Sequence, residues 1–201
     1  MFYPAWKRVE DIIGAILAGT VLSPIWLLVI LAVKLEFPKE PALVKLARLS
    51  EGRIIYVYKF RGMIPSADKL KSSLAHLNER TDGPFFKIRH DPRVTRVGRV
   101  IRKFRLDELP QLINVLKGEL SLVGPRPHEP GEVERYPAEY RHIPLARAGL
   151  TGISQVSGAS SLPFLKELEL DGEYIKKLSL WTDIKILVRS ALILFFDPTA
   201  V

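Results

Sequence analysis

Residues 102–127 read RKFRLDELPQLINVLKGELSLVGPRP, and they combine closely spaced arginines, two adjacent carboxylates and an arginine between two prolines. The apolar spacing in the middle of this stretch predicts a helix over Asp107–Lys117. Asp107 suits the N-cap, Pro110 is tolerated in the first turn, and Gly118 is a typical C-terminal stop. The stretch therefore predicts a short helix that begins with acidic side chains.

The adjacent carboxylates of Asp107 and Glu108 have two interpretations. Acidic residues at a helix start often only cap the backbone and complement the helix dipole. Neighbouring helical positions point about 100° apart, however, so one carboxylate is able to face a reacting centre while the other orients a cation. The prolines on either side of Arg126 fix its backbone and reduce the entropy that is lost when it binds a ligand. An ordinary turn explains Gly124-Pro125 equally well, but it does not explain this arginine.

Arginines recur at every third position before the carboxylate pair, at Arg93, Arg96, Arg99, Arg102 and Arg105. These guanidinium groups would repel one another unless anions were present, and arginine binds phosphate in a bidentate manner. Lys59 and Arg61 add positive charge at the end of a predicted strand, where ligands often bind. The alternative is a solvated basic surface that meets lipid headgroups.

Two later aspartates fall in predicted helices among apolar residues. Asp183 follows Ser179, and we interpret it as a satisfied carboxylate at a helix start. Asp171 is able to complete a metal site with Asp107 and Glu108. The chain has no cysteine and its four histidines show no paired spacing, so any metal is expected to be a hard cation held by oxygen.

The remaining pattern predicts an α/β fold that is mostly helical and has a small sheet. The β-branched and aromatic residues of Arg53–Phe60 predict a strand. Further helices are expected over Ser66–Arg80, from Thr95 to Phe104, over Pro163–Lys177 and over Leu180–Phe196, and an extended segment over Gly149–Gly158. The last helix is amphipathic, which suits a core helix as well as a helix on a membrane surface.

The segment Ile12–Val33 carries no charge, and as a straight helix it would extend over roughly 33 Å, enough to cross a bilayer. Pro24 removes a backbone donor near its middle, and Ser23 beside it is able to satisfy the freed carbonyl. Lys7 and Arg8 precede the segment and more lysines follow it, while basic residues favour the cytoplasmic side. We therefore expect a re-entrant helix-break-helix over residues 1–36, with a straight span as the alternative.

The formal net charge of +8 favours anionic partners: nucleic acid, phosphorylated ligands or an acidic membrane surface. A nucleic-acid binder would need aromatic residues interleaved with the basic row, and Arg93–Lys103 contains none, so we expect no nucleic acid. A catalytically silent module on the membrane surface is the other competing class. It predicts that Asp107→Asn leaves function intact.

Three ordered motifs, Tyr58–Met63, Arg102–Gln111 and Leu116–Pro127, resemble the bacterial sugar transferase family, and the likeness extends from Lys7 to about Leu187. The resemblance implies a small monotopic phosphoglycosyl transferase, with residues 37–201 as one catalytic unit on the cytoplasmic face of the bacterial inner membrane. It implies transfer of a sugar-1-phosphate from a UDP-sugar to polyprenyl (undecaprenyl) phosphate, with release of UMP. This reaction begins exopolysaccharide, O-antigen or glycoprotein glycan assembly.

The resemblance also implies a role for each matching residue. Asp107 would be the nucleophile that forms an aspartyl phosphosugar, and Asp107, Glu108 and Asp171 would hold Mg²⁺. Phosphate groups would be bound by Lys59, Arg61, Arg102 and Arg126. The re-entrant membrane helix is matched by Lys7, Arg8, Ser23 and Pro24. Membrane lipids are expected partners, and the resemblance leaves room for a homodimer.

This chain departs from the family pattern at six positions, which are Leu46, Ser50, Gly62, Ala148, Ser157 and Ala159. Gly62 stands where the family usually has Thr or Ser. None of these positions falls on the carboxylate pair or on Arg126. They concern the sugar and nucleotide contacts, not the type of reaction.

Overall fold

The computed structural model describes residues 3–158 and 161–196, so Ala159 lies outside the described part of the chain. Helices predominate, and the strands form two small sheets of two strands each. The elements in chain order are α1 (Ala5–Glu36), β1 (Leu43–Ser50), β2 (Arg53–Phe60), η1 (Ala67–Leu70), η2 (Ala75–Leu77), α2 (Arg96–Lys103), η3 (Leu106–Glu108), α3 (Gln111–Lys117), β3 (Ser121–Val123), α4 (Pro130–Val133), η4 (Ala138–Tyr140), η5 (Ile143–Leu145), β4 (Gly149–Thr151), α5 (Ile153–Val156), α6 (Phe164–Lys176) and α7 (Leu180–Phe196). The expected α/β class with mostly helical content is confirmed.

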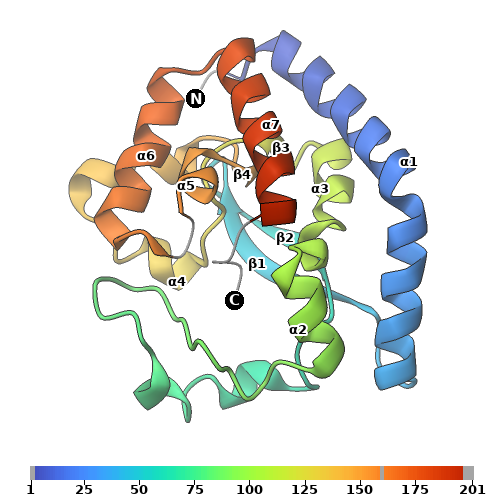
Figure 1. The fold of residues 1–201 in the computed structure, drawn as a ribbon. Coiled ribbons are helices and arrows are strands. Elements are labelled where there is room, and N and C mark those ends of the chain that lie inside the picture. Colours follow the sequence, from blue (N-terminus) through green and yellow to red (C-terminus); the bar gives the residue numbers. More distant parts are fainter. Residues whose placement is uncertain (1–2, 159–160, 197–201) are drawn as a thin grey trace.

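The strands β1 and β2 form an antiparallel hairpin between the flanking helices α1 and α6 (Figure 1). The register places Ser50 opposite Arg53. Glu51 and Gly52 connect the strands with φ angles of 52° and 72°, the left-handed conformation that a two-residue hairpin turn of type I′ requires at both positions. The strand predicted over Arg53–Phe60 is confirmed at both ends. The second sheet pairs β3 with β4 in parallel.

The helix α1 continues through Pro24, so the expected break is not present. The hydroxyl of Ser23 donates a hydrogen bond of 2.8 Å to the carbonyl of Thr20. In a regular helix this carbonyl would accept the N–H of residue 24, which proline lacks. The hydroxyl of Ser23 supplies the hydrogen bond in its place, as predicted. Figure 1 shows that α1 follows one side of the molecule and changes direction part-way along its length, without folding back on itself. Re-entry concerns the membrane and stays a prediction.

One side of α1 packs on the core while the other is exposed. Ala15, Val29 and Val33 are buried. The exposed large apolar residues are Trp6, Val9, Ile13, Ile16, Leu17, Val21, Leu27, Leu28, Leu31 and Leu35. By length and composition, α1 is apolar enough to cross a membrane. An exposed apolar surface of this extent marks a site of contact with lipid or with another protein.

The helices around residues 95–118 follow the prediction in part. The side chain of Thr95 accepts the backbone N–H of Gly98 and caps α2 as expected. Asp107 does not cap α3, however. It lies in the 3-10 turn η3, where the N–H groups of Glu108 and Leu109 donate to carbonyls three residues back, and α3 begins only at Gln111. This correction matters for function, because the carboxylates lie in a tight turn before the helix.

The helix expected over Ser66–Arg80 is wrong. The chain forms only the short turns η1 and η2 there, and Leu70 and Leu77 from the predicted apolar face are exposed. Apolar spacing cannot stabilise a helix when no core surface covers it. Hydrogen bonds from side chains stabilise this segment instead. The side-chain amide oxygen of Asn78, for example, accepts the backbone N–H groups of Arg80 and Lys87.

The C-terminal helices agree with the sequence. The helix α6 covers nearly all of the range Pro163–Lys177, and α7 has the predicted ends. The segment Gly149–Gly158 is extended only over β4, because α5 follows it. Ile186 of α7 is buried in the core, whereas Trp181 and Val188 are exposed. The core interpretation of α7 is therefore confirmed for one side, and the membrane-surface interpretation stays a prediction for the other.

Candidate functional site

The carboxylate pair lies in the turn η3, between α2 and α3. Arg105, just before the turn, has a φ of 52°, a left-handed conformation that is uncommon for a residue other than glycine. This conformation separates the axis of α2 from the following turn. Backbone strain of this kind often occurs at functional sites, and here it adjoins Asp107 and Glu108.

Lys59, from the end of β2, lies against both carboxylates. Its Nζ is 2.6 Å from Oε1 of Glu108 and 3.7 Å from Oδ2 of Asp107. The side chains of Lys59, Asp107 and Glu108 are 21%, 13% and 32% exposed. The three charges are thus partly shielded from water but still accessible, as a site for a soluble ligand must be.

The two carboxylates differ in acidity. Burial raises the pKa of Asp107 and the negative charge of Glu108 adds to this, while Lys59 and Arg102 act against it. Burial also tends to raise the pKa of Glu108, but Lys59 and Arg126 outweigh it and bring that pKa down to about 2. Glu108 is therefore fully ionised at neutral pH. Asp107 is the carboxylate whose basicity its surroundings increase, which suits a nucleophile.

Arg102 and Arg126 reach this site from different parts of the fold. Arg102 ends α2 and lowers the pKa of Asp107, whereas Arg126 follows β3 and lowers the pKa of Glu108. Together with Lys59 they surround two carboxylates with positive charge. Three segments far apart in the sequence, around residues 59, 102–108 and 126, therefore contribute charges of both signs to one site, as a phosphate-binding centre requires.

Asp171 holds the backbone of the arginine segment. Its Oδ2 accepts the N–H of Arg126 at 2.9 Å, while its Oδ1 is buried and has no hydrogen-bond partner within residues 3–158 and 161–196. Burial raises the pKa of Asp171 to about 6. Among the residues that the structure describes, no three His, Cys, Asp or Glu side chains converge as a metal-binding group. Asp171 does not converge with Asp107 and Glu108 in this structure, and its part in a metal site stays a prediction.

The carboxylate pair still fits a magnesium ion by its chemistry. Magnesium prefers oxygen ligands, and in phosphoryl-transfer sites it is usually held by one or two carboxylates together with waters and substrate phosphates. Glu108 offers an ionised carboxylate, and Asp107 offers a second oxygen donor beside it. Asp107 and Glu108 are the residues that would hold the ion.

The other predicted site residues lie elsewhere. The guanidinium of Arg61 bonds the carbonyl of Pro41 at 2.9 Å and pairs with Glu40 at 3.3 Å, so it fastens the segment after α1. The guanidinium of Arg8 donates to two carbonyls at the C-terminal end of α3, at 2.6 Å each. These two arginines have structural partners, which the sequence did not indicate.

Lys7 also has a structural role. It is buried, and its Nζ lies 2.5 Å from Oδ2 of Asp183, which is also buried. The hydroxyl of Tyr174 donates to the other oxygen of Asp183 at 2.8 Å. Asp183 is thus satisfied, as expected, although its main partner comes from α1. The long separation in sequence left no local signal for this pair.

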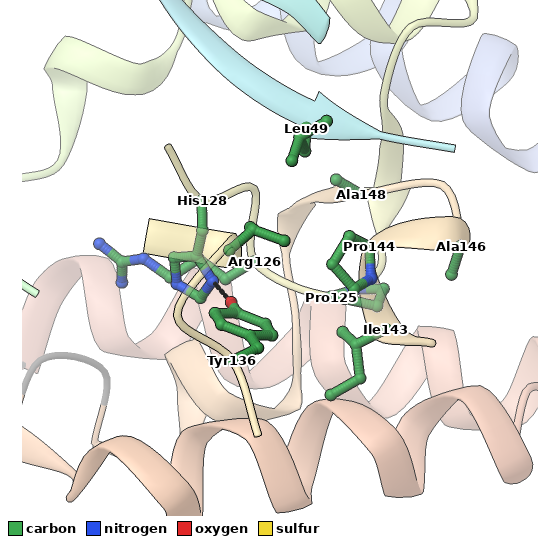
Figure 2. A pocket seen from close by; sticks show the side chains of 10 residues that line it. Leu49, Pro125, Arg126, His128, Tyr136, Ile143, Pro144, Ala146 and Ala148 are labelled. Carbon is green, nitrogen blue, oxygen red and sulfur yellow. Dashed lines mark hydrogen bonds between the residues drawn. The ribbon is translucent and has the colours of Figure 1, made fainter. Parts of the chain in front are cut away.

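A buried histidine supports the segment that carries Arg126. In Figure 2, the ring of His128 lies beside the hydroxyl of Tyr136, and its Nδ1 is hydrogen-bonded to that hydroxyl. Burial, with the charge of Arg126 as a lesser cause, holds the pKa of His128 well below its usual value. The ring is therefore neutral, and its Nδ1 shares a hydrogen bond with the hydroxyl of Tyr136. The sequence showed only that this histidine had no metal-binding partner nearby in the chain.

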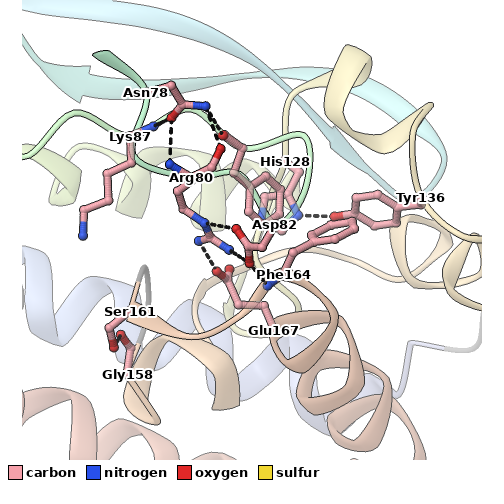
Figure 3. A network of polar contacts seen from close by, with 11 residues as sticks. Asn78, Arg80, Asp82, Lys87, His128, Tyr136, Gly158, Ser161, Phe164 and Glu167 are labelled. Carbon is pink, nitrogen blue, oxygen red and sulfur yellow. Dashed lines mark hydrogen bonds and ion pairs between the residues drawn. The ribbon is translucent and has the colours of Figure 1, made fainter. Parts of the chain in front are cut away.

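A second network joins the loop over residues 78–87 to α6 (Figure 3). Arg80 pairs with Glu167 at 2.7 Å and with Asp82 at 3.0 Å, and Asp82 accepts the N–H of Phe164 at the start of α6. The network is thus a long-range helix cap. The charge of Arg126 counteracts the rise in the pKa of Glu167 that burial causes, so this network is electrostatically linked to the arginine segment.

Two of the departures from the family pattern, Ser50 and Ala148, are hydrogen-bonded to each other. The hydroxyl of Ser50 donates to the carbonyl of Glu119 at 2.9 Å and accepts the N–H of Ala148 at 3.1 Å. It links β1 to the start of β4 inside the molecule. These replacements therefore join the scaffold without touching the carboxylate pair.

Comparison with known proteins identifies the family of this chain. The model of the family described as bacterial sugar transferase matches residues 2–197. The undecaprenyl-phosphate galactose phosphotransferase of Salmonella typhimurium is 40% identical over 189 residues, which are 92% of this chain and 39% of that protein. The UDP-glucose:undecaprenyl-phosphate glucose-1-phosphate transferase of Caulobacter vibrioides is 40% identical over 194 residues, which are 92% of this chain and 67% of that protein.

A shorter relative is covered more fully. The exopolysaccharide production protein ExoY of Sinorhizobium fredii is 37% identical over 190 residues, which are 92% of this chain and 83% of that protein. The chain thus spans about two fifths of the length of the Salmonella relative and most of the length of the Sinorhizobium one. Because the family model matches nearly the whole chain, this protein belongs to the bacterial sugar transferase family.

Proposed function

We propose that this protein transfers a sugar-1-phosphate from a UDP-sugar to polyprenyl phosphate through a covalent intermediate on Asp107. The observation that carries the proposal is the arrangement of Asp107 and Glu108 around Lys59, with the charges of Arg102 and Arg126 close by. The names of the relatives support the two substrates, and they support undecaprenyl phosphate as the acceptor. Such transfer begins the assembly of a bacterial glycan.

In the first step, an Asp107 carboxylate oxygen attacks the phosphorus that bears the sugar. The bond between this phosphorus and the oxygen that bridges to the uridine-bearing phosphate breaks, and UMP leaves with that electron pair. Lys59, Arg102 and Arg126 neutralise the charge on the phosphate oxygens, which is the main requirement of phosphoryl transfer. Glu108 stays ionised and keeps Lys59 in place at 2.6 Å.

In the second step, a phosphate oxygen of the polyprenyl phosphate attacks the same phosphorus. The bond to Asp107 breaks, the carboxylate is regenerated, and the product is a polyprenyl diphosphate sugar. A carboxylate nucleophile thus divides one displacement between two bulky anions into two steps. Magnesium, when bound, would supply further neutralisation of phosphate charge beside Asp107 and Glu108.

The lipid tail of the acceptor requires the site to lie at a membrane boundary. The exposed apolar side of α1 is suited to enter the lipid, and Ser23 satisfies its backbone at Pro24. We propose that α1 is re-entrant and anchors a monotopic protein on the cytoplasmic face of the inner membrane, where UDP-sugars are available. The exposed side of α7 would then contact lipid headgroups.

The test is intact-mass measurement of the purified chain after incubation with Mg²⁺ and, separately, UDP-glucose, UDP-galactose or UDP-N-acetylgalactosamine. A phosphosugar adduct is expected with one of them, and release of UMP should stop when the metal is chelated. Asp107→Asn should remove the adduct and lower turnover about 10³-fold or more. Asp68→Asn, at an exposed aspartate, is the matched control.

Two results would contradict this mechanism. Turnover that persists in Asp107→Asn would exclude a covalent intermediate on this residue. Intact biological function in the same variant would favour a catalytically silent module on the membrane surface.

A further inference from the structure

The backbone of α2 lies directly against the chain just after β2. A Cβ atom added to Gly98 would come within 1.9 Å of the carbonyl oxygen of Gly62 and 2.8 Å of its Cα. Gly98 is buried, and both atoms belong to the backbone, so neither is able to turn away as a side chain would. Any other residue at position 98 therefore forces α2 away from Gly62.

Hydrogen bonds hold the two segments at this close distance. The carbonyl of Gly62 accepts the N–H of Thr95 at 3.1 Å, and Met63 forms a β-bridge with Val94. Thr95 in turn accepts the N–H of Gly98 at 2.8 Å. The first turn of α2 is thus fixed on both sides of the glycine contact, and a displacement of the helix would break these bonds.

The contact also reaches the phosphate site. A Cβ added to Gly62 would lie 3.7 Å from Cδ of Arg102 and 3.8 Å from its Cγ, and 3.4 Å from Cα of Gly98. These are ordinary van der Waals distances, so the aliphatic part of Arg102 passes over Gly62 with room for a small side chain there. Because Gly62 follows the strand that carries Lys59, the contact joins the elements that supply both cations.

We propose that the contact between Gly62 and Gly98 positions Arg102 beside Asp107, so that Gly98 is a positioning residue for the phosphate site. The inference rests on the proposed function. Its basis is an asymmetry: position 98 has no space for a methyl group, whereas position 62 accepts one. Position 62 therefore accepts either glycine or the small Thr or Ser of the family, whereas position 98 in α2 requires glycine.

A double-mutant cycle separates positioning from folding. Gly98→Ala, Arg102→Met and the double variant are assayed for kcat/KM with the UDP-sugar that the wild type uses. Gly98→Ala should lower kcat/KM about tenfold or more, and it should change the Arg102→Met enzyme less than about twofold. Gly131→Ala is the control, because nothing lies within 4 Å of its added Cβ. An equal loss from Gly98→Ala in both backgrounds would overturn the proposal.

A second pair of variants covers the case in which Gly98→Ala does not fold. Gly62→Ala should retain activity, while Gly62→Leu should extend against Arg102 and lower kcat/KM in the presence of Arg102 only. If Gly62→Ala and Gly62→Leu behave alike, position 62 does not act through Arg102 and the proposal fails.

Hydrogen exchange distinguishes this failure from failure of the proposed function. If the wild type neither forms an adduct nor turns over a UDP-sugar, the function is wrong, but the positioning contact is still testable. Peptides covering residues 102–108 should exchange faster in Gly98→Ala, or in Gly62→Leu if Gly98→Ala does not fold, than in Gly131→Ala. Equal exchange would show that the glycine contact does not hold this segment.

Discussion

Two lysine–carboxylate pairs in this protein have nearly the same geometry and different surroundings. Lys7 and Asp183 are 2.5 Å apart, with side chains 2% and 0% exposed, at the contact of α1 with α7. Lys59 and Glu108 are 2.6 Å apart, but they are 21% and 32% exposed and lie beside Asp107. The distance between the charges therefore says little about what a pair does.

Access to the pair decides its role. The Lys7 pair is closed off, and its partners come from within the fold: Tyr174 donates to Asp183, and the carboxyl of Glu10 lies close enough to interact with both charges. The Lys59 pair is open, has a second carboxylate nearby and lies close to arginines. Closed charges fix the position of an element, whereas open ones are able to exchange partners with a ligand. The first pair is structural and the second is the candidate for chemistry.

The largest expected effect is on the closed pair. Lys7→Met leaves Asp183 as a buried charge without its partner, which should lower the free energy of unfolding by about 3–5 kcal/mol. Urea unfolding measures this loss. In the double variant Lys7→Met/Asp183→Asn both charges are gone and Tyr174 still has an acceptor, so most of the stability should return. A loss no greater than that of Lys59→Met would break the comparison.

The next effect is on the open pair, and it concerns activity. Lys59→Met should lower kcat/KM about 100-fold, because a preorganised positive charge is lost at the phosphate. Its free energy of unfolding should change by less than about 1 kcal/mol, since partly exposed pairs contribute little. Lys69→Met, at an exposed lysine, is the matched control for both measurements. Unchanged turnover in Lys59→Met would place the chemistry elsewhere.

The smallest expected effect is on the pH dependence of stability, and it concerns His128, a buried titratable side chain. The pKa of His128 is well below its usual value of 6.5 in the folded chain, so only the unfolded chain binds this proton as the pH falls below 6.5. Between pH 7 and pH 5.5 the folded state should thus lose about 1 kcal/mol from this residue. In His128→Asn the decrease in the free energy of unfolding from pH 7 to pH 5.5 should be about 1 kcal/mol smaller than in the wild type. Urea unfolding at both pH values measures it. The other histidines are exposed, and an unchanged loss would contradict the assignment to His128.

The sequence predicted those features that depend on neighbours in the chain. The strand Arg53–Phe60 and the helix α7 have the predicted ends, because their residue types and caps are local. The hydrogen bond from the hydroxyl of Ser23 to the carbonyl of Thr20 is equally local. The helix expected over Ser66–Arg80 failed because its apolar side meets no core, which periodicity cannot reveal.

The same distinction applies to the candidate site. The motif identified Asp107, Glu108 and Arg126 as side chains suited to phosphate chemistry, because their types and spacing are written in the chain. Only the tertiary structure decided that Lys59 lies between the carboxylates, that Asp171 holds the backbone of Arg126, and that Arg61 and Lys7 have structural partners. The reason is physical: a residue's chemistry is local, whereas its partner and its burial depend on which distant segments the fold brings together.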